Sequence, residues 1–236
     1  MIVFIKILLA HLIGDFILQS NAWVKAKEEK KLKAWQLYIH ALLHAAIAMM
    51  LVANADFLKY ALMLGGLHLV IDAAKLLLQT DRHKQAFFFG DQLLHLISIA
   101  LVYILYQGAV DFPVIELNEK TWWLILLVTL LTQPAAIGMK FLLAHWTPHT
   151  NEDNSESLQH AGKYIGILER LFVFTFVVTN NWDAVGFLIA AKSVFRFGDL
   201  TTAKDRKLTE YILIGTLISF GIAILTGIFF LTYNSK

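Results

Sequence analysis

The chain has 236 residues, of which 58% are hydrophobic and only 16% are charged, and its mean hydropathy is +0.61. This composition excludes an ordinary water-soluble domain and indicates a membrane protein. The formal net charge is +2 and the sequence has no basic arm, so nucleic acid is not an expected partner. Because the chain contains no cysteine, it can form no disulfide, thiolate metal site or iron–sulfur cluster.

Hydrophobic runs of about 17 to 25 residues recur from end to end, and each is long enough to cross a hydrocarbon core of about 30 Å as a helix. They predict an all-α, polytopic transmembrane helix bundle of about eight helices. The first run has no small-residue cleavage site and is interrupted by His11 and Asp15, which indicates a retained span. Pro134 lies inside the fifth run and predicts a kink there. The predicted helices are residues 2–19, 36–53, 57–79, 86–106, 121–144, 164–179, 182–197 and 208–231.

We expect two four-helix halves, residues 1–108 and 109–236, with a flexible cytoplasmic linker at about 145–163. Lys and Arg gather in the connections at 21–35, 81–85 and 196–207. These connections fall on one side if the helices alternate, and the positive-inside rule makes that side cytoplasmic. Both termini should then lie on the opposite side.

Each of the first four predicted helices carries two ionisable residues spaced i, i+4, which places both on one helix face. Counted from the cytoplasmic ends at about 1.5 Å per residue, the eight residues fall at two matched depths, about 6 to 11 Å and about 12 to 17 Å. The shallow level holds Asp15, His40, Asp72 and Asp91, and the deep level holds His11, His44, His68 and His95.

Because unpaired carboxylates are costly in a membrane, four pairs at matched depth predict a functional polar site. A single pair is equally compatible with a histidine bonded to a neighbouring carbonyl. Mixed His and Asp donors without sulfur favour Zn²⁺, Mn²⁺ or Fe²⁺, as one ion or as two side by side. All eight residues are candidate metal ligands, and Asp15, Asp72 and Asp91 are also candidate catalytic groups.

The second half carries a separate charged set near the predicted cytoplasmic helix ends. Lys192 and Arg196 are spaced i, i+4 and can bind a phosphate or carboxylate group of a substrate. The alternative is that they extend to the membrane surface or pair with acidic residues as structural contacts. The candidate substrate-binding residues are Glu169, Arg170, Lys192, Arg196 and Glu210.

The segments His11–Gln19, His68–Asp72 and Asp91–His95 resemble a bacterial family of polytopic membrane proteins, domain of unknown function 3307. The segments around Glu169, Lys192 and Glu210 resemble its second half, so the likeness covers nearly the whole chain. The His and Asp boxes also resemble, more distantly, inner-membrane proteins designated as metal-dependent hydrolases. These resemblances imply a multi-pass protein of the bacterial inner (cytoplasmic) membrane.

The leading hypothesis is a metal-dependent hydrolase that acts on a lipid or lipid-linked anionic substrate entering from the cytoplasmic leaflet. A di-iron membrane oxygenase is the first alternative, because His40 and His44 form an HxxxH box. The other boxes pair His with Asp, and no HxxHH cluster is present. A divalent metal or proton transporter is the second alternative. The outer parts of the first four helices lack comparable polar residues, which favours a site open to one side.

Overall fold

The computed structural model describes residues 1–106, 118–144, 156–196 and 203–234, and in these ranges the chain is helical, without strands. The chain divides into two compact units, Met1–Thr129 and Leu130–Lys236. The boundary expected at 108/109 and most of the linker expected at 145–163 lie outside the described residues. The end of that linker, from Glu156 onward, belongs to a helix rather than to a loop.

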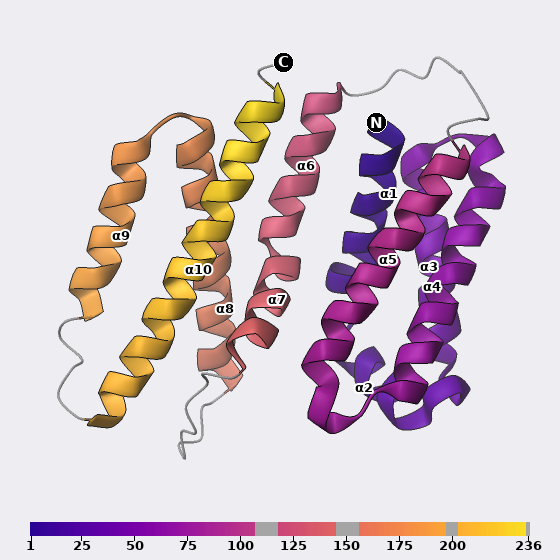
Figure 1. The fold of residues 1–236 in the computed structure, drawn as a ribbon, viewed down its shortest axis with the longest axis horizontal. Helices are drawn as coiled ribbons and strands as arrows, with labels where there is room; N and C mark the ends of the chain where they lie inside the picture. The colour runs from indigo at the N-terminus through magenta and orange to yellow at the C-terminus, as the bar shows by residue number, and fades with distance from the viewer. Residues whose placement is uncertain (107–117, 145–155, 197–202, 235–236) are drawn as a thin grey trace. The chain divides into compact units, whose positions relative to one another are not determined.

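The first unit is built on four long helices that run side by side (Figure 1). A shorter helix, α2, lies across one end of them, because the chain turns by 87° between Ile2–Leu18 and Asn21–Lys33. Ser20 caps α2 by accepting a hydrogen bond from the Trp23 amide at 3.3 Å. The elements are α1 (Ile2–Leu12), the π-helix η1 (Ile13–Leu18), α2 (Asn21–Lys30), η2 (Lys31–Lys33), α3 (Trp35–Val52), η3 (Ala55–Phe57), α4 (Leu58–Leu78), η4 (Asp81–His83), α5 (Lys84–Tyr106) and α6 (Glu119–Leu131).

The close approach of α3 and α4 depends on small residues. A Cβ added at Gly65 would lie 2.9 Å from the backbone oxygen of Ala41 and 3.1 Å from the Cβ of Ala45. Small residues at such an interface allow two membrane helices to approach closely. The tight fit brings two ionisable side chains together, and the rings of His44 and His68 stack with centroids 3.7 Å apart.

An apolar core fills the part of this unit beyond the histidines, near the amino terminus of α1. Its buried members include Ile7, Ala48, Leu64, Ile99 and Val102. The His and Asp side chains of the cluster therefore lie in the part nearer to α2. The outer part of the bundle is mainly apolar, as expected, but it includes the buried Lys6 of α1.

In the second unit, helices α7 (Gln133–Leu143), α8 (Glu156–Val178), α9 (Trp182–Arg196) and α10 (Ala203–Asn234) pack together. The kink predicted at Pro134 is confirmed, because α6 ends at Leu131 and α7 begins at Gln133. The break exposes backbone carbonyls that a continuous helix would use. The buried Arg170 guanidinium donates hydrogen bonds to the oxygens of Leu131 at 2.8 Å and Thr132 at 3.3 Å, and to Ser219 Oγ at 3.1 Å.

The helices confirm a multi-pass membrane protein but not the arrangement of eight spans. In the described part of the chain, five helical segments are long and apolar enough to cross a membrane, and the bent pair at the amino terminus adds a sixth if it counts as one span. The five are Trp35–Val52, Ala55–Leu78, Lys84–Tyr106, Glu119–Leu143 and Glu210–Tyr233. At 15 residues, α9 extends about 22 Å, which is less than the thickness of a hydrocarbon core.

Candidate metal centre

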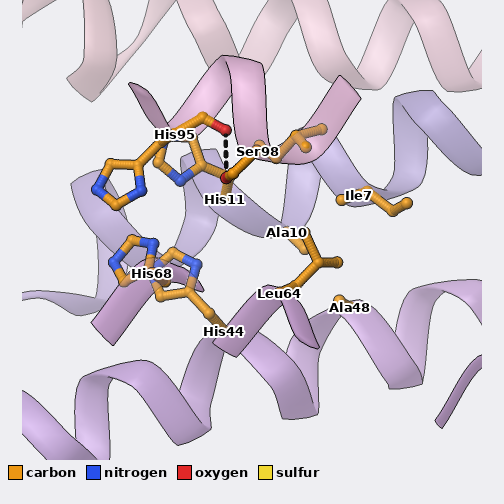
Figure 2. A pocket seen from close by; sticks show the side chains of 10 residues that line it. Ile7, Ala10, His11, His44, Ala48, Leu64, His68, His95 and Ser98 are labelled. Carbon is orange, nitrogen blue, oxygen red and sulfur yellow. Dashed lines mark hydrogen bonds between the residues drawn. The ribbon is translucent and has the colours of Figure 1, made fainter. Parts of the chain in front are cut away.

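The four histidines of the predicted deep level line one cavity inside the first unit (Figure 2). Each comes from a different helix of the bundle, and all are buried: His11 on α1, His44 on α3, His68 on α4 and His95 on α5. The cavity has a volume of about 20 Å³. That volume has room for one water molecule or ion and is too small for an organic substrate.

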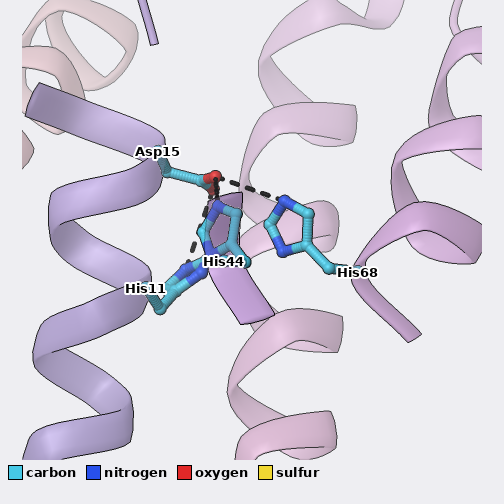
Figure 3. A group of neighbouring side chains, drawn as sticks. All are labelled: His11, Asp15, His44 and His68. Atoms are coloured by element: carbon cyan, nitrogen blue, oxygen red, sulfur yellow. Dashed lines mark hydrogen bonds and ion pairs between the residues drawn. The ribbon is translucent and has the colours of Figure 1, made fainter. Parts of the chain in front are cut away.

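Asp15 of the π-helix lies beside three of these histidines, His11, His44 and His68 (Figure 3). Its Oδ1 atom lies 3.0 Å from Nε2 of both His40 and His44 and 3.4 Å from Nε2 of His68, and its Oδ2 lies 3.8 Å from Nε2 of His11. The two predicted levels therefore meet through their side chains, although their backbone positions are about 6 Å apart along the helices. Short π-helical segments occur frequently at functional sites.

Gly14 explains how a histidine can lie so close to this turn. A Cβ added at Gly14 would lie 2.4 Å from Cε1 and 2.5 Å from Nε2 of His44, closer than real contacts allow. The His44 ring therefore rests directly on the backbone of the π-helix. Gly90, the other glycine that precedes a site aspartate, has open space at the same point. Only the first of the two glycines is required by packing.

The carboxylates of Asp72 and Asp91 lie beside the same histidines and are each paired with a lysine. Oδ1 of Asp72 is 3.5 Å from Nε2 of His95 and 3.8 Å from Nε2 of His68. Lys27 of α2 donates to Oδ2 of Asp72 at 2.7 Å, and Lys75 donates to Oδ2 of Asp91 at 2.8 Å. Neither lysine was among the site residues predicted from the sequence. Lys75 follows Asp72 by three residues on one helix face, a signal that was available, whereas Lys27 carries no such signal.

Two glutamines complete the polar cluster. Gln92 donates to Oδ2 of Asp15 at 3.1 Å, and its Oε1 is 3.2 Å from Nε2 of His11. Gln19 places its Nε2 atom 3.0 Å from Nε2 of His40. Both residues belong to the sequence boxes quoted above, but nothing in helical periodicity marks them as members of the site.

The crowding at His40 exceeds what hydrogen bonding can satisfy. Within 3.1 Å of its Nε2 atom lie Oδ1 of Asp15, Nε2 of Gln19 and Nε2 of His68. A ring nitrogen carries either one proton or one lone pair, so it cannot bond well to all three. Nitrogen and oxygen donors that converge in this way are typical of a metal-binding site.

Within the described ranges, three overlapping groups of side chains have the geometry to hold a metal ion. In each group the donor atoms lie within 4.8 Å of one another. Two ligands of a tetrahedral zinc ion are about 3.4 Å apart, given bond lengths of 2.0 to 2.1 Å. Many of the separations above are close to this value. The groups are His11, Asp15, His44 and His68; His40, His68 and Asp72; and Asp72, Asp91 and His95, which together include all eight residues singled out from the sequence.

The charged residues of the second unit form a different kind of cluster. Lys192 donates to Glu169, and Arg170 makes the backbone contacts at the helix break described above. Glu210 is exposed at the start of the apolar part of α10. Arg196 lies at the end of α9, and its side chain is outside the described residues. Substrate binding by these residues stays a prediction.

Fold and site together define a multi-pass membrane protein with a buried His and Asp cluster that can hold metal. A family model matches residues 3–125, and on that match the chain belongs to the family described as protein of unknown function (DUF3307). The match covers the whole candidate metal centre. No curated protein and no solved structure matches the chain, so these comparisons give no support to the hydrolase likeness.

Proposed function

We propose that the chain is a metal-dependent hydrolase of the bacterial inner membrane, acting on a lipid or lipid-linked anionic substrate from the cytoplasmic leaflet. The observation that carries the proposal is that the three donor groups share members: His68 belongs to two, and so does Asp72. A shared carboxylate can bridge neighbouring ions, and paired ions are used to stabilise the attacking and leaving oxygens of a displacement. Nitrogen and oxygen donors without sulfur favour Zn²⁺, Mn²⁺ or Fe²⁺.

The residues of the chain have distinct tasks in this proposal. A metal ion held by the histidines would supply a hydroxide nucleophile near neutral pH and polarise the scissile group. The carboxylate of Asp15 fixes the ring orientations of His40 and His44, as carboxylates commonly do for imidazoles at metal sites. Oδ1 of Asp91 accepts no hydrogen bond from any described residue, which leaves it available to bind a metal ion.

The surroundings of the carboxylates support a lipid-like substrate. Phe16 and Phe88 make an edge-to-face contact next to Asp15 and Asp91, with ring centroids 6.5 Å apart. Ile17 beside them is 50% exposed and faces the lipid if η1 lies in the membrane. The Lys75 ammonium lies 5.9 Å from the Phe88 ring centroid and its side chain is 26% exposed. A hydrocarbon chain would contact the two phenylalanines while an anionic group reached Lys75.

The two alternatives receive less support. A transporter needs a polar route to the far side, whereas the cavity is lined on that side by Ile7, Ala48, Leu64 and Ile99. A di-iron oxygenase would use the same donor types. The proposed hydrolase and the oxygenase can be told apart by experiment, because only the oxygenase consumes oxygen when loaded with iron.

The test uses detergent-purified full-length protein supplied in turn with Zn²⁺, Mn²⁺ or Fe²⁺. Metal content is measured by elemental analysis, and hydrolysis is measured on a panel of lipid phosphates and lipid esters. We expect at least one equivalent of metal, and metal-dependent hydrolysis that falls about 10- to 100-fold in Asp15→Asn. His68→Gln should also lose metal, while the matched control His83→Gln, an exposed histidine outside the cluster, should keep both properties.

Equal metal content in His68→Gln and His83→Gln would overturn the proposed site. Oxygen consumption by the iron-loaded protein, without hydrolysis of any lipid in the panel, would replace the hydrolase with the oxygenase. Both results are readable only if the variants elute as single species, so size-exclusion profiles accompany each measurement.

A further inference from the structure

Two buried carboxylates and two lysines form a charge-balanced unit on the α2 side of the cluster. Asp72 and Asp91 are 6% and 5% exposed, and their nearest cations are the ammonium groups of Lys27 and Lys75. Two negative and two positive charges sum to zero. One divalent metal ion would balance the same two carboxylates, so it and the two ammonium groups are electrostatic alternatives.

Unused donor atoms point into the space between these carboxylates. His95 is 1% exposed, and neither of its ring nitrogens has a hydrogen-bond partner among the described residues. Oδ1 of Asp91, 3.4 Å from Nε2 of His95, likewise accepts no hydrogen bond in the part of the chain that the structure describes. The two atoms lie at ion-pair distance but make no hydrogen bond, and buried polar atoms in this state favour a ligand.

We propose that Asp72, Asp91 and His95 form a second cation site, which takes a divalent transition metal in exchange for the ammonium groups of Lys27 and Lys75. The inference rests on the proposed function, since it places this ion beside the one held by His11, His44 and His68. The unused Nε2 of His95 and Oδ1 of Asp91 become ligands, with Oδ1 of Asp72 3.5 Å from the histidine nitrogen. Each lysine ammonium then loses its hydrogen bond to one carboxylate oxygen.

Filling this site has a consequence for α2. Of the ten residues of α2, all of them described, Lys27 is the one that is buried, and its bond to Asp72 ties the helix to α4. A metal ion that displaces the Lys27 ammonium removes that tie. The second ion therefore releases α2 from Asp72 and shifts its position over the cluster, while Glu28 of α2 stays bonded to Gln79 at 3.2 Å and to Lys84 at 3.3 Å.

The first experiment titrates metal-free protein with Zn²⁺ alone and counts bound equivalents. We expect two equivalents in the unaltered chain and the loss of one in Asp91→Asn and in His95→Gln. Lys27→Met removes the competing ammonium and should tighten the second equivalent by at least about tenfold, the factor that one charge-assisted hydrogen bond provides. Lys25→Met is the matched control, because Lys25 is an exposed lysine on the same helix. The affinity of this variant for the second zinc ion should equal that of the unaltered chain.

The outcomes of this titration separate the two proposals. Failure of the unaltered chain to bind zinc would overturn the proposed function and the second site together. Binding of a single equivalent that survives Asp91→Asn would overturn the second site and leave the proposed function standing. Two equivalents that both survive Asp91→Asn and His95→Gln would also overturn it, because those side chains would not be ligands.

The second experiment follows α2 directly and uses the absence of native cysteine. Spin labels at Val24→Cys on α2 and Leu77→Cys on α4, both exposed positions, report the distance between the helices. We expect Zn²⁺ to shift this distance in the otherwise unaltered chain and to leave it unshifted in Asp91→Asn. Lys27→Met should show the shifted distance before zinc is added. The same distance in all three proteins, with and without zinc, would contradict the release of α2.

Discussion

The two units of the chain bury charged side chains in opposite ways. In the second unit, the hydrogen bonds of Arg170 end on two backbone carbonyls and a serine hydroxyl. In the first, imidazoles and carboxylates converge on one another, and the ring nitrogens of His95 have no hydrogen-bond partner among the described residues. A buried charge that meets backbone groups supports the fold, whereas a cluster of like donors with unused atoms indicates a ligand. The contrast separates a structural site from a binding site without reference to any relative.

The largest effect that this contrast predicts is for Arg170. In Arg170→Leu the oxygens of Leu131 and Thr132 lose their buried donor, at about 1 to 3 kcal/mol each. We expect a strong loss of monodisperse protein after heating. Ser219→Ala removes only a hydroxyl acceptor and should cost about 1 kcal/mol. An Arg170→Leu protein as stable as the parent would show that Arg170 serves a ligand rather than the helix break.

A smaller and more local effect is expected from metal itself. An ion present at 100 times its dissociation constant stabilises the folded state by about 2.7 kcal/mol. Because the candidate ligands lie on α1, η1, α3, α4 and α5, hydrogen exchange should slow in those elements on addition of Zn²⁺. Treatment with a chelator should reverse the change. Equal slowing in α8 and α10 would contradict the separation of the two units.

The smallest effect tests the fit between the π-helix and His44. Gly14→Ala forces the His44 ring to move and should cost about 1 to 3 kcal/mol. Zinc affinity should fall with it, because His44 would leave Asp15. Gly90→Ala is the matched control; its Cβ meets open space, and replacing a helical glycine should stabilise the chain by about 0.5 to 1 kcal/mol. The same response from both variants would refute the packing argument.

The helical pairs were sufficient to identify the cluster from the sequence. The i, i+4 spacing assigns one helix face to each pair, and a rise of about 1.5 Å per residue gives the depth of each residue. Side chains at equal depth on facing helices are expected to lie close together. The assignment of His40 to the shallow level alone was too simple. Its Nε2 is 3.0 Å from Asp15 and 3.1 Å from His68, so it contacts both levels.

The features that the sequence analysis missed depend on a turn that hydrophobic periodicity does not describe. The lysines of residues 21–35 were counted as one cytoplasmic loop, although Ser20 is a typical helix cap and indicates a helix after it. The 87° bend places that helix across the bundle and carries Lys27 to Asp72, 45 residues away in sequence. A contact between segments so distant follows from the path of the chain and not from any local pattern.

The broken helix at Thr132 also restricts the order in which the chain can be assembled. The donor for the Leu131 oxygen is supplied by a residue 39 positions later, on α8. During synthesis, α6 and α7 therefore reach the insertion machinery before α8 supplies the guanidinium that completes their break. Until then the insertion machinery or water must satisfy those carbonyls. A nascent chain truncated before α8 should consequently stay bound to the translocon instead of partitioning into the bilayer.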